Sequence, residues 1–265
     1  MKYLIFLIIV SSLTIVSAQS VHEETFNVPL SDPNKPGKLE VSIHNGGITI
    51  EAYSGKEVVI QMKAVEPEDK EEASTREGLK RISGSALDVE ISEEDNEVEI
   101  DGGNSGRTDF AVKVPVNFTL RISTHHNGDI KVKGVKGEME LDAHHGAIYM
   151  EDVAGSAIAD THHGEIKGNF TSITSDNPMA FSTYHGDVDI TFPSNAGFEA
   201  KVKTTKGDIF TDFDLEMKMQ NPEQSTDEDG RKEIKIGGWM YGTVGSGGQE
   251  YMFNTYHGDI ILRKS

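Results

Sequence analysis

The sequence predicts an all-β protein, a single-stranded β-solenoid in which coils of 18–22 residues stack along one axis. Three observations predict this class: a glycine phrase that recurs, an alternation of apolar and polar residues around each glycine, and a glycine spacing too short for paired helices. The chain of 265 residues contains no cysteine. The stack must therefore gain its stability from a continuous core, without disulfides.

Residues 1–18 have the pattern of a secretory signal peptide. Lys2 supplies the positive end, residues 4–10 form an apolar run, and residues 16–18 form a small-residue cleavage site. An uncleaved membrane anchor would need about 18 to 25 apolar residues, and polar residues interrupt this run. We therefore expect an exported chain that begins at Gln19 after cleavage.

The mature chain, residues 19–265, is expected to form one solenoid domain with no transmembrane segment, because no later stretch is long and apolar enough to span a bilayer. It is strongly acidic: the full sequence has 44 acidic and 25 basic side chains, a formal net charge of −19. Binding to nucleic acid requires a basic surface, so this balance argues against a nucleic-acid partner.

The strongest signal is a phrase of the form Thr-His-His-Gly-Asp-Ile, which recurs with small variations six times between residues 124 and 260. The repeat glycines are Gly128, Gly146, Gly164, Gly186, Gly207 and Gly258. The apolar residues two positions after them are Ile130, Ile148, Ile166, Val188, Ile209 and Ile260. The first five glycines are 18, 18, 22 and 21 residues apart, so each unit predicts a coil of strands.

Alternation around the glycines agrees with strands that bury one face. The residues two positions before the Thr or Ala of each phrase are apolar: Ile122, Leu141, Ala159, Phe181, Val202 and Phe253. Together with the Ile or Val after each glycine, they predict two inward columns. Strict alternation breaks by one residue between the columns, where we expect glycine to allow a bulge or a positive φ. Stacked coils should then lie about 4.8 Å apart.

The N-terminal half is a looser version of the same pattern. Residues 39–50 read as one more strand-glycine-strand unit, which predicts the first coil. Residues 67–82 are charged and rich in helix formers, and predict a short amphipathic helix inserted in the stack. Residues 86–91, 97–100 and 110–114 alternate as strands do. Residues 214–230 are polar and acidic and predict a surface loop.

Several segments resemble a known family. They are residues 114–120 (Val-Pro-Val-Asn-Phe-Thr-Leu), the His-Gly-Asp-Ile repeats, the glycine-rich residues 242–248 and the closing residues 256–260. Together these resemble the bacterial "putative adhesin" family, a domain of unknown function related to the auto-transporter adhesin head domain. The resemblance implies a right-handed β-solenoid in an exported bacterial protein. It implies no catalytic residue.

Histidines supply the candidate metal ligands. Eight of the ten histidines lie one to three positions before a repeat glycine, and strand spacing should bring successive rings to about 5 Å. The candidate metal-binding column is His126, His145, His163, His185 and His257. Such a column is typical of a linear zinc-binding or pH-sensing ladder. The alternative, which we favour, is that stacked rings and hydrogen bonds simply fill a solenoid surface copied by duplication.

Carboxylates supply weaker candidates. An acidic column follows the glycines: Asp129, Glu165, Asp187, Asp208 and Asp259. Like charges one strand apart need solvent, basic partners or a cation, so calcium binding is an alternative to solvation. Asp187, Asp189 and Lys167 contain the groups that a polysaccharide-cleaving solenoid would use, but nothing in their spacing selects them.

We therefore expect an exported, non-catalytic β-solenoid that acts in adhesion or interaction at the cell surface or in the periplasm, without a cofactor. Its partner would be a protein or a glycan, bound by repeated His, Tyr and Thr side chains. Two other functions stay open: binding of divalent metal by the stacked histidines, and enzymatic action on polysaccharides.

Overall fold

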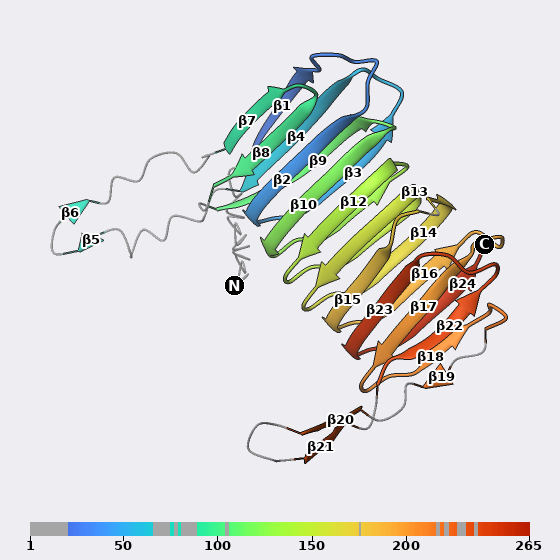
Figure 1. Cartoon of the computed structure of the whole chain (residues 1–265). Helices are drawn as coiled ribbons and strands as arrows, with labels where there is room; N and C mark the ends of the chain where they lie inside the picture. Colours follow the sequence, from blue (N-terminus) through green and yellow to red (C-terminus); the bar gives the residue numbers. More distant parts are fainter. Residues whose placement is uncertain are drawn as a thin grey trace, which may run out of the picture.

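The computed structural model describes residues 21–65, 75–76, 79–80, 89–103, 106–174, 176–215, 218–219, 223–226, 232–235 and 238–265. Within these ranges all regular structure is β, which confirms the predicted class. Hydrogen bonds join twenty of the described strands into one sheet that coils on itself, and two short antiparallel pairs lie outside it (Figure 1). The expected signal peptide at residues 1–18 lies outside the described residues.

The main sheet contains strands of two to fourteen residues. They are β1 (Val21–Pro29), β2 (Gly37–Asn45), β3 (Ile48–Tyr53), β4 (Glu57–Val65), β7 (Val89–Glu94), β8 (Glu97–Gly102), β9 (Arg107–Pro115), β10 (Phe118–His126), β11 (Ile130–Lys133), β12 (Lys136–Ala143), β13 (Ile148–Thr161), β14 (Ile166–Ile173), β15 (Met179–His185), β16 (Val188–Phe192), β17 (Phe198–Thr204), β18 (Ile209–Thr211), β19 (Lys218–Met219), β22 (Met240–Val244), β23 (Glu250–His257) and β24 (Ile260–Lys264).

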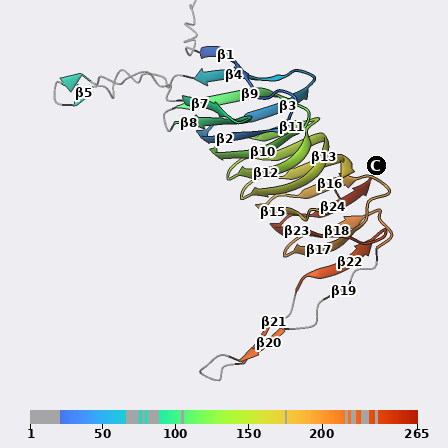
Figure 2. The same ribbon diagram turned by 45° about the horizontal axis from the view of Figure 1, so that its top comes forward.

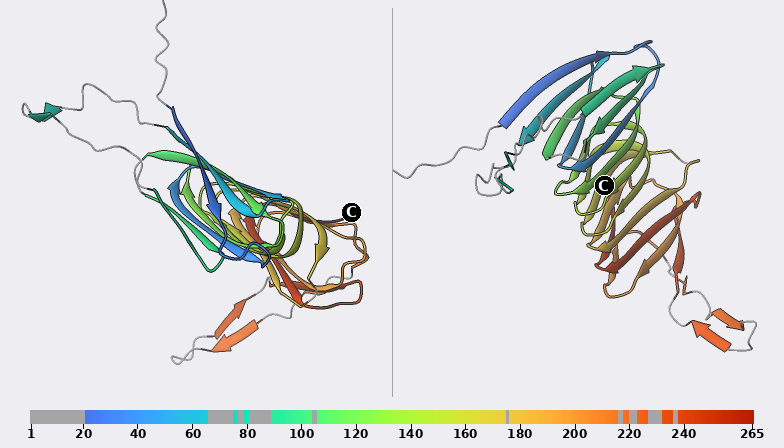
Figure 3. Two further views of the ribbon diagram at one scale, coloured as in Figure 1. Left: turned by 90° about the horizontal axis from the view of Figure 1, so that it is seen from above. Right: turned by 90° about the vertical axis from the view of Figure 1, so that its left-hand side faces the viewer.

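Each repeat makes a coil of two strand segments joined at a glycine corner. Segments before the corner stack in parallel in the order β8, β2, β10, β12, the second half of β13, β15, β23 and β17. Segments after the corner stack as β9, β3, β11, the first part of β13, β14, β16, β24 and β18. Viewed along the stack, the coils superpose around a common interior (Figure 3). This arrangement is solenoid-like, while the right-handed coiling and the 18–22-residue coil length stay predictions.

Two coils lie out of sequence order. The coil of β8 and β9 stacks outside that of β2 and β3, so residues 39–50, expected in the first coil, form the second. The coil of β23 and β24 lies between that of β15 and β16 and that of β17 and β18 (Figure 2). Both insertions depend on pairing between segments that are distant in the sequence. Local sequence patterns do not predict such pairing.

The interior is a continuous core formed by the two predicted inward columns. The apolar residues before the glycines are all buried: Ile122, Leu141, Ala159, Phe181, Val202 and Phe253. After the glycines, Ile130, Ile148, Ile166, Val188 and Ile260 are fully buried, whereas Ile209 is half-buried. Ile209 is more exposed because it lies on β18, which pairs with β24 at the end of its column.

Antiparallel strands cover both ends of the parallel stack. At one end β7 pairs with β8, β4 pairs with β9, and β1 pairs with β4. At the other end β22 pairs with β17, and β19 pairs with β22. Such terminal strands use the hydrogen-bonding groups that an open edge would offer to another chain.

The helix predicted over residues 67–82 is wrong wherever the structure describes that segment. β5 (Thr75–Arg76) pairs antiparallel with β6 (Leu79–Lys80), and the other residues of the range lie outside the described part. Helix propensity alone stabilises so short a helix only marginally, and Gly78 lowers it further. Within the expected loop at 214–230, the described residues include β19 and also β20 (Glu223–Thr226), which pairs with β21 (Lys232–Lys235).

None of the described segments forms a helix with the length and apolar character needed to cross a membrane.

Candidate functional site

The glycine corners are where adjacent coils approach most closely. A Cβ atom at Gly146 would lie 1.9 Å from the backbone oxygen of Gly128, and one at Gly164 would lie 2.2 Å from that of Gly146. These three glycines do not have a positive φ. The positive φ expected of these glycines is therefore absent at the three corners. Glycine is required here because any side chain would collide with the backbone of the neighbouring coil.

Threonines at the corners form hydrogen bonds to glycines of neighbouring coils. Thr161 donates its hydroxyl hydrogen to the carbonyl oxygen of Gly146 at 2.7 Å, and Thr183 donates to that of Gly164 at 2.8 Å. Thr124, Thr204 and Thr255 make equivalent bonds to other corner glycines. Burial of a hydroxyl is costly unless it is hydrogen-bonded, so the threonine of the phrase is explained by the fold alone.

Most of the acidic column is also used by the fold. Asp129 accepts a hydrogen bond from the backbone N–H of Ala147 at 3.0 Å, and Asp187 accepts one from that of Asp259 at 2.8 Å. Asp259 in turn accepts from the N–H of Asp208 at 2.8 Å. Each of these carboxylates therefore accepts a hydrogen bond from a backbone N–H group. In the calcium alternative, a bound cation would have had this role.

The catalytic alternative finds no free acid–base pair among its candidates. Asp189 is held by the guanidinium of Arg263, with contacts of 2.8 and 3.1 Å. Lys167 lies beside Asp189 in the register of β14 and β16, and Asp187 holds the next coil as described above. Asp187 and Asp189 are therefore each used by a hydrogen bond within the fold.

On the outer side of the corners, aromatic side chains form two rows that run across successive coils. The first ring ladder consists of His44, His125, His144, His162, Tyr184 and Tyr256, with neighbouring ring centroids 4.6 to 5.3 Å apart. The second ring ladder consists of His126, His145, His163, His185 and His257, with centroids 4.6 to 5.2 Å apart. The second ladder is the predicted histidine column, and the spacing agrees with the expected value of about 5 Å.

Neighbouring rings depress one another's basicity. Partial burial, followed by the charge of adjacent histidines, lowers the pKa of His126, His144 and His163 below the ordinary value. Partial burial also lowers the pKa of His257, next to Lys206, whose Nζ lies 3.0 Å from Nε2 of the ring. These imidazoles are consequently neutral near pH 7, with ring nitrogens free to accept a hydrogen bond or a metal ion.

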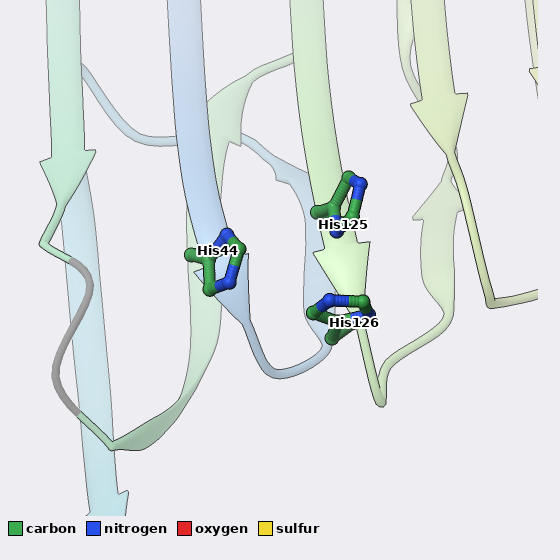
Figure 4. Close-up of side chains that lie close together, drawn as sticks. All are labelled: His44, His125 and His126. Carbon is green, nitrogen blue, oxygen red and sulfur yellow. The ribbon is translucent and has the colours of Figure 1, made fainter.

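Groups that could hold a metal form across the two ladders. Most rings within one ladder are nearly parallel, as for His145 and His163 at 1°. The rings of His126 and His145 are tilted by 30°, and their Nδ1 atoms lie 3.2 Å apart. Consecutive histidines on one strand are nearly perpendicular: His125 and His126 meet at 81°. Among the described residues, two triads have ligand atoms within 4.8 Å of one another. One is His44 with His125 and His126 (Figure 4), and the other is His125 with His144 and His145.

Sharing of zinc along the single column stays a prediction, and the triads add ligand atoms from the first ladder. Of the five predicted ligands, the triads contain His126 and His145, while His163, His185 and His257 continue the ladder without joining a triad. His44 was not predicted as a ligand. Its signal was present in the phrase His44-Asn45-Gly46, in which one histidine precedes the corner of β2 and β3.

A shallow depression of about 320 Å³ lies along the tyrosine end of the first ladder. Its lining includes the rings of His162, Tyr184 and Tyr256. Polar side chains that line it include Asp160, Ser182, Asn254 and Lys203. Tyr184 is 41% exposed and stacks on Tyr256 with centroids 4.8 Å apart. Burial raises the pKa of Asp160.

A larger cleft of about 660 Å³ lies at the other end of the molecule, where β1, β4 and β9 meet the first corners. Charges of both signs line it, among them Lys63, Arg107, Asp109 and Asp129. Asp109 receives the N–H of Gly47 at 2.8 Å and pairs with Arg107 at 3.2 Å. Two of its charged groups are thus already paired with each other.

Comparison with known proteins gives a family match over nearly the whole chain. A family described as Toastrack DUF4097 matches residues 20–263. The comparison with curated proteins found no match.

Solved structures with a similar arrangement include three bacterial proteins. A "putative cell adhesion protein" from Clostridium sporogenes ATCC 15579 is 12% identical, with 93% of this chain and 100% of that chain covered and a TM-score of 0.46. A "putative adhesin" from Bacteroides fragilis NCTC 9343 is 13% identical over 92% and 98%, with a TM-score of 0.33. One from Parabacteroides merdae ATCC 43184 is 10% identical over 92% and 96%, with a TM-score of 0.26. Similarity at this level says nothing about ligand or activity.

Proposed function

This chain belongs to the Toastrack DUF4097 family, and we propose that it is an exported, non-catalytic adhesion protein that binds a neutral glycan along the tyrosine end of its first ring ladder. The signal-peptide pattern of residues 1–18 supports a location at the cell surface or in the periplasm. The observation that carries the proposal is the exposed, stacked pair Tyr184 and Tyr256 beside a depression with polar walls.

The chemistry of this depression suits a sugar. Flat aromatic faces pack against the apolar C–H faces of sugar rings, and hydroxyl, carboxylate and amide groups beside them bond the sugar hydroxyls. Tyr184 and Tyr256 supply the faces, and Asp160, Ser182 and Asn254 supply the polar groups. Rings one coil apart also offer equivalent contacts to a polymer that itself repeats, so weak contacts add along the chain.

The charge of the molecule narrows the ligand class. A net charge of −19 repels acidic polysaccharides and nucleic acids at a distance. A neutral glycan avoids this repulsion. The same argument disfavours an acidic protein surface as the partner.

A glycan array and calorimetric titration with neutral polysaccharides test the proposal. Tyr184→Ala and Tyr256→Ala should each weaken binding by about tenfold. A nucleic-acid base that stacks on an aromatic ring gains about 1–3 kcal/mol, and we expect a similar gain for a sugar ring. Tyr149→Ala is the matched control, because that tyrosine lies on β13 and donates its hydroxyl hydrogen to Glu165 at 2.9 Å, away from the depression.

Three outcomes would contradict the proposal: no neutral glycan bound by the wild-type chain, tighter binding of anionic than neutral glycans, or equal losses in the Tyr149→Ala control. A thermal melt of each variant checks that any loss of binding is not a loss of folding.

A further inference from the structure

We propose that the histidine end of the ring ladders binds a divalent transition-metal ion, through the triad His44, His125 and His126 and the overlapping triad His125, His144 and His145. This site lies away from the depression at Tyr184 and Tyr256, and it does not depend on glycan binding. His125 belongs to both triads.

The first support is the crossing of ring planes between consecutive histidines. His125 and His126 meet at 81° with centroids 4.2 Å apart, and His144 and His145 meet at 64° with centroids 4.3 Å apart. Because a nitrogen lone pair lies in the plane of its ring, crossed rings direct nitrogens toward one point. The neighbouring coil then supplies the third imidazole, from His44 or His125. Each triad therefore combines two consecutive histidines of one coil with one histidine of the adjacent coil.

The second support is a group of ring nitrogens that one proton cannot satisfy. Nδ1 of His145 lies 2.9 Å from Nδ1 of His144 and 3.2 Å from Nδ1 of His126. It also lies 3.1 Å from the backbone oxygen of His125. An imidazole nitrogen carries one hydrogen or one lone pair, so it satisfies only one of these three neighbours well. A cation coordinated by the nitrogens would replace the unfavourable contacts with bonds.

The ligand set selects a class of metal. Imidazole suits zinc, copper and nickel, and three histidines with one open position are a common zinc arrangement. Calcium and magnesium require several oxygen ligands, and the two triads contain none. The order of affinities for first-row metals further predicts tighter binding of Cu²⁺ than of Zn²⁺ or Ni²⁺.

The tyrosine end of the same ladders provides a built-in comparison. There Tyr184 and Tyr256 occupy the first ladder beside His185 and His257. Among the residues that the structure describes, neither of these histidines joins a triad. His185 thus has similar exposure and stacking to the proposed ligands but lacks their neighbours, which makes it a matched control.

Isothermal titration of ZnCl₂ into the chain without any histidine tag, at about pH 7.5, measures the site. We expect at least one ion per chain with a dissociation constant on the order of 1–10 µM, and no heat from CaCl₂. Binding of Co²⁺, followed by its visible absorption, reports nitrogen coordination. At about pH 5 the imidazoles are protonated and binding should be lost.

His125→Ala removes the ligand common to both triads. It should weaken Zn²⁺ binding by more than about tenfold, because loss of even an outer partner of a metal-binding histidine costs about 10- to 100-fold. His185→Ala should leave the affinity within about twofold of the wild type. If His125→Ala disturbs folding by circular dichroism, the double variant His44→Gln with His144→Gln takes one ligand from each triad and should show the same loss.

Absence of Zn²⁺ binding by the wild-type chain would overturn the proposal, as would unchanged affinity in a folded His125→Ala or double variant. An equal loss in His185→Ala would do so too, because it would place the ion elsewhere on the ladder. Tyr184→Ala and Tyr256→Ala should keep full metal affinity, so failure of the glycan proposal and failure of this one are distinguishable.

Discussion

The inner and outer sides of one repeat corner differ in burial and in the contacts that their side chains make. On the inner side of the corner at Gly164, Thr161 and Ile166 are buried, and the threonine hydroxyl bonds the neighbouring coil. On the outer side, His162 and His163 are exposed and stack on the rings of adjacent coils. Both sides come from one short phrase. The difference teaches that the residues which define the repeat are used by the fold, while the exposed rings are available for binding.

The variation among copies agrees with this division. Glycine is present at all six corners, whereas the outer pair is His-His in the first three copies, Tyr-His in two others and Thr205-Lys206 in the remaining one. A side chain at the corner would collide with backbone, but an exposed ring can be exchanged for another at little cost to stability. Ligand chemistry can therefore change along the rod while the architecture stays the same.

The largest loss of stability should come from adding a side chain at a corner glycine. Gly146→Ala places a Cβ atom 1.9 Å from the backbone oxygen of Gly128, a clash that no rotation of a side chain relieves. We expect the free energy of unfolding to fall by about 4 kcal/mol or more, measured by urea denaturation. Gly47→Ala is the matched control, since its Cβ would be 3.5 Å from the nearest atom and should cost less than about 1 kcal/mol. Equal losses in both variants would remove the special role of the corner.

An intermediate effect should follow loss of a corner hydroxyl. Thr183→Val keeps the shape of the side chain but removes the donor to the carbonyl oxygen of Gly164. The expected loss is about 1–2 kcal/mol in the free energy of unfolding, because a buried acceptor is left without its partner. Ser42→Ala, which removes an exposed hydroxyl on β2, should change stability by less than about 0.5 kcal/mol. A Thr183→Val variant as stable as the wild type would mean that the ladder of threonine bonds contributes nothing.

The smallest effect should be the contribution of one exposed histidine to the pH dependence of the stability. The folded protein lowers the pKa of His163, which is faced by His145, His162 and His185, so the unfolded chain binds more protons as the pH falls. The stability contributed by the neutral ring is present above the unfolded pKa of about 6.5 and is lost as the pH falls through the folded value. His163→Gln should therefore lose less stability than the wild type between about pH 7.5 and 5. A steeper loss in the variant would reverse the assigned sign.

Much of the local architecture followed from the printed sequence. The period of two around each glycine predicted which side chains are buried, as with Phe181 and Ile166. The position of the paired histidines predicted a ladder with nearly the observed spacing. These features depend on contacts between residues a few positions apart, or between copies of one phrase, and both are visible in the sequence.

Other features depended on pairing that no local pattern records. The coil of β23 and β24 lies between two coils that precede it in the sequence. Its position is seen in the register of Val188 with Ile260 and of Ile260 with Ile209. The metal-binding triads depended on ring orientation, since perpendicular and parallel imidazoles have the same sequence signature. The helix expected at 67–82 relied on helix propensity and on apolar residues at helical spacing, and β5 pairs with β6 in the described part of this range.

The sequence by itself determined the class of fold, the inward columns and the residues that project beside each corner, because strand alternation and glycine are local properties of the chain. The tertiary structure decided the order of the coils, the strands that close both ends and the approach of His44 to His125 and His126. The physical reason is that hydrogen-bond ladders accept any strand of matching register, so the choice of neighbour is made by packing over the whole core.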